Sequence, residues 1–164
     1  MNTKLLTTTI LLSLIISGES FSQSGIREYG IEIGILKTGR FNSITDVSGV
    51  KVGHKTIIEG DEIRTGVTAI IPHPGNLFRK KTPAAIYVGN GFGKLAGFTQ
   101  VAELGNIETP VILTNTLSVP VALDALITYT LSQEGAESIG SVNGIVGETN
   151  DGGLNNIRAR RVSQ

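Results

Sequence analysis

The sequence predicts a mixed fold, α/β or α+β, in which β-structure dominates. Several short apolar or alternating stretches bounded by Gly and Pro are typical of strands, and two other stretches have apolar residues at helical spacing. Glycine accounts for 21 of the 164 residues, nearly twice the usual share of roughly 7%, which implies many tight turns. A chain of 164 residues, 40% of them apolar, is long enough for one domain with a hydrophobic core.

Residues 1–22 are expected to be a secretory signal peptide. Lys4 precedes an apolar run over 5–16, which is shorter than the roughly 20 residues that span a bilayer. Ser20 and Ser22 stand at the −3 and −1 positions of a small-x-small cleavage pattern. We therefore expect cleavage after Ser22, export to the periplasm or the medium, no membrane anchor, and a mature domain over 23–164. A buried N-terminal helix is the alternative.

Strands are expected in the mature chain wherever apolar residues alternate or run between turn residues. In order, the expected ranges are 31–35, 47–57, 66–71, 84–88, 111–113 and 144–147. Pro72 and Pro74 end the third strand, while Gly49 and Gly53 predict a turn or bulge in the second.

One helix is well defined between Ser118 and Leu131. Ser118 is a suitable N-cap, and Pro120 lies in the first turn, where its missing N–H costs nothing. The predicted apolar stripe consists of Val119, Ala122, Leu123, Leu126, Ile127 and Leu131. Gly135 is expected to stop this helix, and a shorter helix is expected over 95–104.

Composition and motifs exclude several functions. Basic and acidic residues number 14 each, so electrostatic capture of nucleic acid is not expected. Cysteine is absent, which excludes disulfides, thiolate metal sites and cysteine nucleophiles. His54 and His73, the two histidines, have no partner at metal-ligand spacing, so neither a metal nor a cofactor is expected. No G-x-S-x-G nucleophile elbow occurs.

The segment Gly-Asn-Gly-Phe-Gly-Lys over 89–94 lies between a predicted strand and a predicted helix, where phosphate-binding loops occur. It lacks the Walker A spacing, and Leu95 stands where that motif needs Ser or Thr. Gly91, Gly93 and Ala96 match the dinucleotide pattern, but no acidic residue closes a second strand at the required distance. Nucleotide binding is therefore a minor alternative.

Two predicted strands run directly into polar segments. The strand over 111–113 continues into Thr-Asn-Thr-Leu-Ser, and the strand over 144–147 continues into Glu-Thr-Asn-Asp-Gly. Ligands of α/β folds gather at such strand ends, but ordinary turns use the same residue types to satisfy backbone groups. Spacing alone leaves both interpretations open.

Five blocks taken together carry a family resemblance: ITDVSGVKVGH over 44–54, RTGVTAI over 64–70, GNGFGK over 89–94, LTNTLSV over 113–119 and GETNDGGLNNIR over 147–158. In this order they resemble the DmpA-like family of L-aminopeptidase/D-esterases and β-peptidyl aminopeptidases. The resemblance implies an αββα sandwich similar to N-terminal nucleophile hydrolases, present here as an N-terminal fragment. It also implies a precursor that cleaves itself, exposing a Ser nucleophile that releases N-terminal residues from peptides, amides or esters.

The resemblance implies that the nucleophile lies beyond this chain, which therefore carries no catalytic residue and is expected to be inactive alone. Glu148 corresponds to the family carboxylate that holds the free amino group of the substrate. Asn150, Asn115, Thr116 and Asn90 are weaker candidates for lining the same pocket. A partly buried carboxylate suits this role because it forms charge-assisted hydrogen bonds with an ammonium. An ordinary turn carboxylate is the alternative interpretation of Glu148.

The expected partners are a peptide or aminoacyl-amide substrate, the C-terminal segment of the family fold, and further copies of the chain. A fragment of a sandwich leaves sheet edges and apolar faces unpaired, which favours assembly with a partner. The alternative function is a non-catalytic binding or assembly module derived from the same fold.

Overall fold

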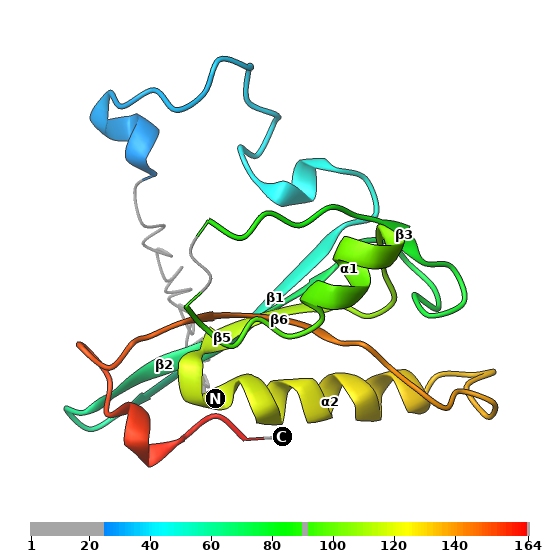
Figure 1. Ribbon diagram of the computed structural model, residues 1–164. Helices are drawn as coiled ribbons and strands as arrows, with labels where there is room; N and C mark the ends of the chain where they lie inside the picture. The colour runs from blue at the N-terminus through cyan, green and yellow to red at the C-terminus, as the bar shows by residue number, and fades with distance from the viewer. Residues whose placement is uncertain (1–24, 90–91, 164) are drawn as a thin grey trace, which may run out of the picture. The chain divides into compact units, whose positions relative to one another are not determined.

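A computed structural model describes residues 25–89 and 92–163 of the chain (Figure 1). The predicted signal peptide over 1–22 lies outside the described residues. The chain divides into two units, Met1–Lys37 and Thr38–Gln164. Within the described part, no helix is both long enough and apolar enough to cross a membrane.

The described part of the first unit contains one 3-10 helix, η1, at Ile26–Tyr29. The strand predicted over 31–35 is wrong, because these residues form no strand and the Ile33 and Ile35 side chains are exposed. Gly34 has a φ of 76°, which interrupts the extended backbone that the alternation requires. Alternation without a neighbouring strand to pair with does not make a sheet.

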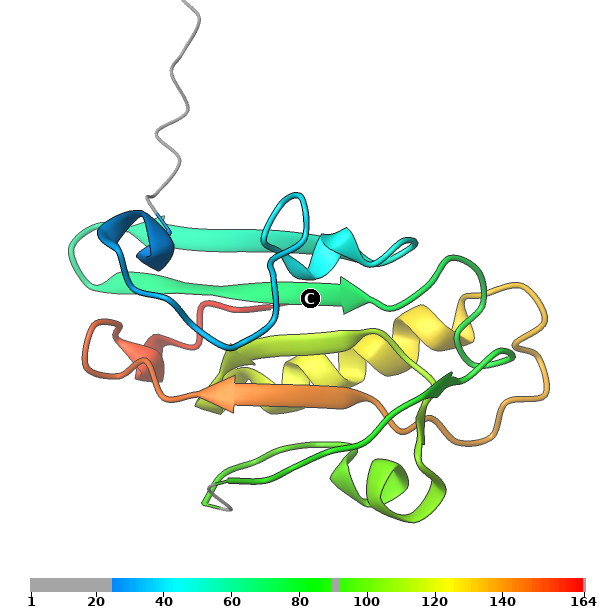
Figure 2. The same ribbon diagram turned by 90° about the horizontal axis from the view of Figure 1, so that it is seen from above.

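The second unit is built on a four-stranded sheet with the order β1-β2-β5-β6 (Figure 2). Its strands are β1 at Lys51–Glu59, β2 at Ile63–Ile71, β5 at Val111–Asn115 and β6 at Ile145–Thr149. β1 and β2 form an antiparallel hairpin, β2 pairs antiparallel with β5, and β5 pairs parallel with β6. The predictions for these four strands are confirmed with shifted ends.

β1 begins at Lys51, later than predicted, because the chain before it turns. The 3-10 helix η2 occupies Ile44–Asp46, and Gly49 follows in the left-handed region with a φ of 89°. A turn at Gly49 is therefore confirmed, since glycine adopts this conformation without a steric penalty. Gly53 lies inside the regular ladder, opposite Ala69.

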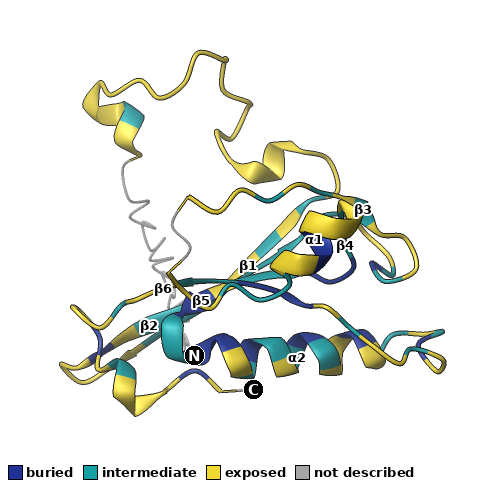
Figure 3. Ribbon diagram, viewed as in Figure 1, coloured by how far each residue is buried: buried dark blue, intermediate teal, exposed yellow. Residues whose placement is uncertain are grey.

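Helix α2 at Val119–Leu131 lies along one face of this sheet (Figure 1). Its residues Val119, Ala122 and Leu126 pack with Val146 of β6 in the hydrophobic core. Leu131, predicted in the same stripe, is 47% exposed. Figure 3 shows the buried positions at β5, β6 and α2, whereas β1 is mostly exposed.

Each end of α2 differs from the prediction: the N-cap side chain makes no capping hydrogen bond, and the helix stops before Gly135. Ser118 occupies the N-cap position, but its side chain makes no capping hydrogen bond. Asn115 instead caps the 3-10 helix η3 at Thr116–Ser118, which leads directly into α2. The helix ends at Leu131 with Ser132 as its C-cap, and Gly135 turns the chain three residues later with a φ of 77°.

The later part of the segment between β2 and β5, which includes α1, lies beyond the β6 edge of the sheet (Figure 2). Helix α1 at Phe98–Leu104 begins later than predicted, because Gly97 has a φ of 76°. The strand predicted over 84–88 is wrong, since only β3 at Thr82–Pro83 pairs there, with β4 at Asn106–Ile107. Tyr87 is 92% exposed, and Ala84 and Ile86 are only half-buried, so this apolar stretch is not a buried strand.

Candidate functional site

The polar segments that follow β5 and β6 meet at one edge of the sheet. Because the two strands are parallel and in register, Thr114 lies opposite Glu148 and Asn115 lies opposite Thr149. The helix that follows β5 starts at the same edge, with η3 leading into α2. The structure therefore brings the predicted residues of two separate sequence blocks together.

Glu148 is half-buried, and its two carboxylate oxygens have different surroundings. Oε1 accepts a hydrogen bond of 2.7 Å from the backbone N–H of Lys94. Oε2 is buried and has no hydrogen-bond partner among the described residues. A buried carboxylate oxygen without a donor is costly, so this atom is available to a donor supplied from outside the described chain.

Gly93 permits the close approach of the 93–94 backbone to this carboxylate. A Cβ atom at Gly93 would lie 2.5 Å from Glu148 Oε1, so a side chain at this position would force the carboxylate to move. The sequence alone predicts a glycine-rich turn at Gly93 and no contact with Glu148. The only signal was its membership in one of the five family blocks.

Asn115 lies at this edge, but both ends of its amide are already engaged by the protein. Its Nδ2 donates to Thr65 Oγ1 at 2.8 Å, and its Oδ1 accepts from the N–H of Leu117 at 3.1 Å. Thr65 Oγ1 in turn donates to Asp151 at 2.7 Å. Asn115 is 4% exposed and thus ties β2, β5 and the loop after β6 to one another.

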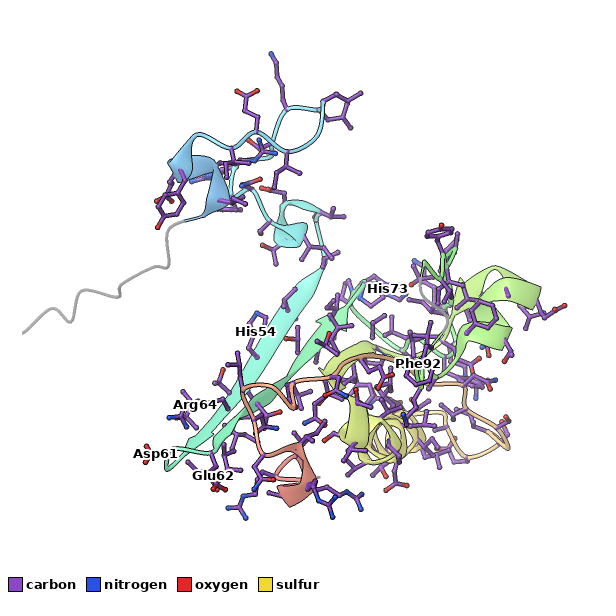
Figure 4. The ribbon with its side chains drawn as sticks, turned by 60° about the vertical axis from the view of Figure 1, so that its left-hand side comes forward. His54, Asp61, Glu62, Arg64, His73 and Phe92 are labelled. Carbon is purple, nitrogen blue, oxygen red and sulfur yellow. The ribbon has the colours of Figure 1, made fainter. Side chains whose placement is uncertain are left out.

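The loop after β6 is also anchored to the tip of the β1–β2 hairpin, where Figure 4 labels Asp61, Glu62 and Arg64. Asn155 accepts a hydrogen bond from the N–H of Arg64 at 3.1 Å. Asn156 donates from its N–H to the carbonyl of Glu62 at 2.8 Å. These contacts hold the chain that leaves Glu148 in one path, and sequence reasoning missed them because they join positions far apart in the chain.

The remaining predicted residues are placed differently. Thr116 is half-buried at the start of η3. Asn150 is exposed and uses its Oδ1 to accept from the N–H of Gly152 at 3.0 Å, an Asx-type turn. Asn90 lies outside the described residues. Ser118, predicted only as a helix cap, is 2% exposed, and its Oγ has no partner among the described residues.

The two histidines occupy separate positions (Figure 4). His54 on β1 contacts Thr68 Oγ1 at 2.8 Å, whereas the His73 ring lies between the carbonyls of Pro74 and Lys80, 2.7 Å from each. Within the described ranges, no group of three or more His, Asp or Glu side chains could hold a metal ion.

A hollow of about 630 Å³ opens at the opposite end of the sheet from Glu148. Lys51, which begins β1, and Ile71, which ends β2, line it together with His73 and Tyr129. None of the predicted site residues lines this hollow, so it is separate from the end of the sheet where Glu148 lies.

Residues 42–164 match the sequence profile of Peptidase family S58. The chain belongs to peptidase family S58. This assignment confirms the resemblance carried by the five sequence blocks.

Curated relatives of this S58 chain include two proteins called β-peptidyl aminopeptidase BapA. The protein from Sphingosinicella xenopeptidilytica is 34% identical over 160 residues, covering 90% of this chain and 39% of the relative. The protein from Sphingosinicella microcystinivorans is 34% identical over 134 residues, covering 77% of this chain and 33% of the relative. The S58 chain thus spans between a third and two-fifths of their length.

Solved structures similar to the S58 chain each cover 84% of it. The PH0078 protein of Pyrococcus horikoshii OT3 is 49% identical with a TM-score of 0.78, over 42% of its own chain. A β-aminopeptidase of Burkholderia sp. is 41% identical with a TM-score of 0.77, over 39% of its chain.

A third structure connects the S58 chain with a fold class. The L-aminopeptidase D-Ala-esterase/amidase of Ochrobactrum anthropi is 30% identical with a TM-score of 0.73, over 41% of its chain. It is described as a prototype for the serine aminopeptidases and as a variant of the Ntn hydrolase fold. The predicted similarity to N-terminal nucleophile hydrolases is confirmed, and the described residues of the S58 chain contribute the β1-β2-β5-β6 sheet with α2 on one face.

Proposed function

We propose that this chain is part of an exported aminopeptidase or amidase that releases N-terminal residues from peptides, amides or esters. The observation that carries the proposal is the buried Oε2 of Glu148, which has no donor among the described residues. The names of the relatives support the same activity, since they are β-peptidyl aminopeptidases and an L-aminopeptidase.

In this proposal Glu148 binds the free ammonium of the substrate. An ammonium has three N–H donors and no acceptor, and its hydrogen bond to a carboxylate is stronger than a neutral one. Oε1 is fixed by the Lys94 amide, so the carboxylate presents Oε2 in a defined direction. Fixing the amino end of the substrate in this way determines which bond is cut, because it sets the register of the peptide relative to the nucleophile.

The proposed nucleophile is a Ser at the amino terminus of a second segment, produced when the complete protein cleaves itself. The free α-amine of such a residue acts as its general base, so neither His54 nor His73 has a part in the reaction. The second segment and further copies of the chain are the proposed assembly partners, and this chain alone is proposed to be inactive.

The experiment compares Glu148→Gln with the unchanged complete protein on an aminoacyl p-nitroanilide. Losing a charge-assisted hydrogen bond is worth about 1.5–3 kcal/mol, so kcat/KM is expected to fall roughly 10- to 150-fold, mainly through KM. Glu103→Gln on the exposed surface of α1 is the matched control and is expected to leave kcat/KM unchanged.

Equal kinetics for Glu148→Gln and the control would remove Glu148 from substrate binding. A complete protein that folds, remains uncleaved and hydrolyses no aminoacyl amide would contradict the enzymatic proposal and support a binding or assembly module instead. Electrophoresis of the purified protein shows whether it has split into two segments.

A further inference from the structure

The strand that carries Glu148, β6, is short and is an outermost strand of the sheet. β6 spans Ile145–Thr149, and among the described residues it pairs along its whole length only with β5. On its other side, the described part of the chain forms one isolated bridge, between Ala96 and Val146. Because successive side chains of a strand point to opposite faces, a slip of one residue would turn Glu148 to the other face of the sheet. The position of Glu148 therefore depends on the register of β6.

Two buried side chains hold the start of β6. Glu108 Oε1 accepts from the backbone N–H of Asn143 at 2.8 Å, and Thr109 Oγ1 accepts from the N–H of Ile145 at 3.3 Å. Consecutive side chains thus bind alternate backbone amides at the point where the strand begins. Glu108 is 5% exposed and Thr109 is fully buried, so water does not replace them when they are removed.

Glu108 is itself fixed by charged and polar neighbours. Lys81 forms an ion pair with its second oxygen, Oε2, and the Lys81 ammonium also lies 4.0 Å from the centre of the Phe78 ring. Burial by itself raises the pKa of Glu108. Lys81, the Asn143 amide and Gln100 together lower this pKa by more than burial raises it, so the net pKa lies below its ordinary range. The carboxylate is therefore ionised and accepts hydrogen bonds at neutral pH.

The same two residues lead directly into β5. Thr109 Oγ1 also donates to the carbonyl of Pro110 at 2.8 Å, and β5 begins at the next residue, Val111, which lies opposite Ile145 in the ladder. The side chains that bind the start of β6 are thus part of the turn that starts β5. Any movement of one strand along the other would break both contacts at once.

We propose that Glu108 and Thr109 are positioning residues that fix the register of β6 against β5 and thereby direct the Glu148 carboxylate toward the substrate amino group. This inference rests on the proposed function. It assigns neither residue a contact with the substrate.

The test uses Thr109→Val and Glu108→Gln in the complete protein, with Thr130→Val as the matched control. Thr130 is also buried, and its Oγ1 donates to the Leu126 carbonyl within α2, so its loss removes a buried hydroxyl without touching β6. The readouts are KM for an amine-bearing substrate, Ki for its desamino analogue, and amide hydrogen exchange over 145–149.

A misplacement of about 1 Å lowers the efficiency of a bound complex by up to about 100-fold. We expect Thr109→Val to raise KM at least tenfold while Ki for the desamino analogue stays the same, and to accelerate exchange in β6. In a Glu148→Gln background Thr109→Val should have no further effect on KM, because the carboxylate that it positions is already lost. The Thr130→Val control should leave KM, the desamino Ki and amide exchange over 145–149 unchanged.

Two results would overturn the inference. One is a Thr109→Val protein whose KM and desamino Ki change in proportion to its lowered melting temperature. The other is unchanged exchange over 145–149, which shows that the register does not depend on this contact. If the unchanged complete protein hydrolyses no substrate, the proposed function fails separately, and the exchange measurement alone decides whether Glu108 and Thr109 set the register.

Discussion

Replacing Gly93 by Ala is expected to push the Glu148 carboxylate out of its position. A Cβ atom on Gly93 would lie 2.5 Å from Oε1 and 3.5 Å from the carboxyl carbon of Glu148. Ordinary van der Waals contact begins at 3.4 Å, so Oε1 has to retreat by about 0.9 Å. Movement of Oε1 directly away from Lys94 N would lengthen their hydrogen bond, now 2.7 Å, beyond the usual range for N–H···O bonds.

The expected loss of activity follows from this displacement. A misplacement of about 1 Å in a group that orients the substrate costs up to about 100-fold. We therefore expect kcat/KM for an aminoacyl p-nitroanilide to fall roughly 10- to 100-fold in the complete Gly93→Ala protein. The free energy of unfolding should change by less than about 1 kcal/mol, because Gly93 is exposed and its φ lies outside the left-handed region.

The assay is steady-state kinetics combined with thermal denaturation of the same preparations. Gly140→Ala is the matched control, since a Cβ atom there meets nothing within 4 Å. A Gly93→Ala protein with the kcat/KM of the control would refute the reasoning, because it would show that displacing the carboxylate does not affect substrate binding. If Gly140→Ala lowered kcat/KM as much as Gly93→Ala, the loss would not be specific to Gly93, and the reasoning would also be refuted.

Three further predictions concern stability. Leu126→Ala should lower the free energy of unfolding by about 2–5 kcal/mol in denaturant titrations, because Leu126 is 3% exposed in the core and truncation leaves a cavity; a loss below 1 kcal/mol would contradict this packing. Gly97→Ala should destabilise by more than about 2 kcal/mol, since the left-handed backbone costs about 1–2 kcal/mol for other residues and the new Cβ would lie 2.6 Å from the Gly144 carbonyl; an unchanged melting temperature would argue against that approach. The lowered pKa of Glu108 stabilises the fold at pH values above the ordinary carboxyl pKa of 4.5, and this contribution is lost as the pH falls through the lower pKa of the folded state. Glu108→Gln should therefore weaken the acid dependence of the melting temperature as the pH falls below 4.5, and an identical acid profile would show that Glu108 does not cause it.

Local apolar patterns correctly predicted those helices and strands that pack against or pair with a second segment of the fold. The stripe of Val119, Ala122 and Leu126 lies in the core, and the apolar runs that became β2, β5 and β6 all pair in one sheet. The same kind of pattern failed over 31–35 and 84–88, where no strand pairs with them among the described residues. Periodicity records which side chains suit a strand, whereas pairing depends on a second segment.

The sequence by itself determined the family and the mixed α/β composition, and it selected Glu148 as the leading candidate for the site. These depend on motifs and on side-chain types, which are properties of single segments. Only the tertiary structure decided that Oε1 of Glu148 is held by the Lys94 amide, that Oε2 has no donor among the described residues, and that both ends of the Asn115 amide are already occupied.

The physical reason is the distance along the chain between the partners. Lys94 and Glu148 are 54 residues apart, and Asn115 and Thr65 are 50 apart. The Asn115–Thr65 contact forms because β2 pairs with β5, and the Lys94–Glu148 contact forms beside the bridge between Ala96 and Val146 of β6. The spacing of residues within a single segment does not predict which distant segments pair. These pairings are established only when the sheet folds.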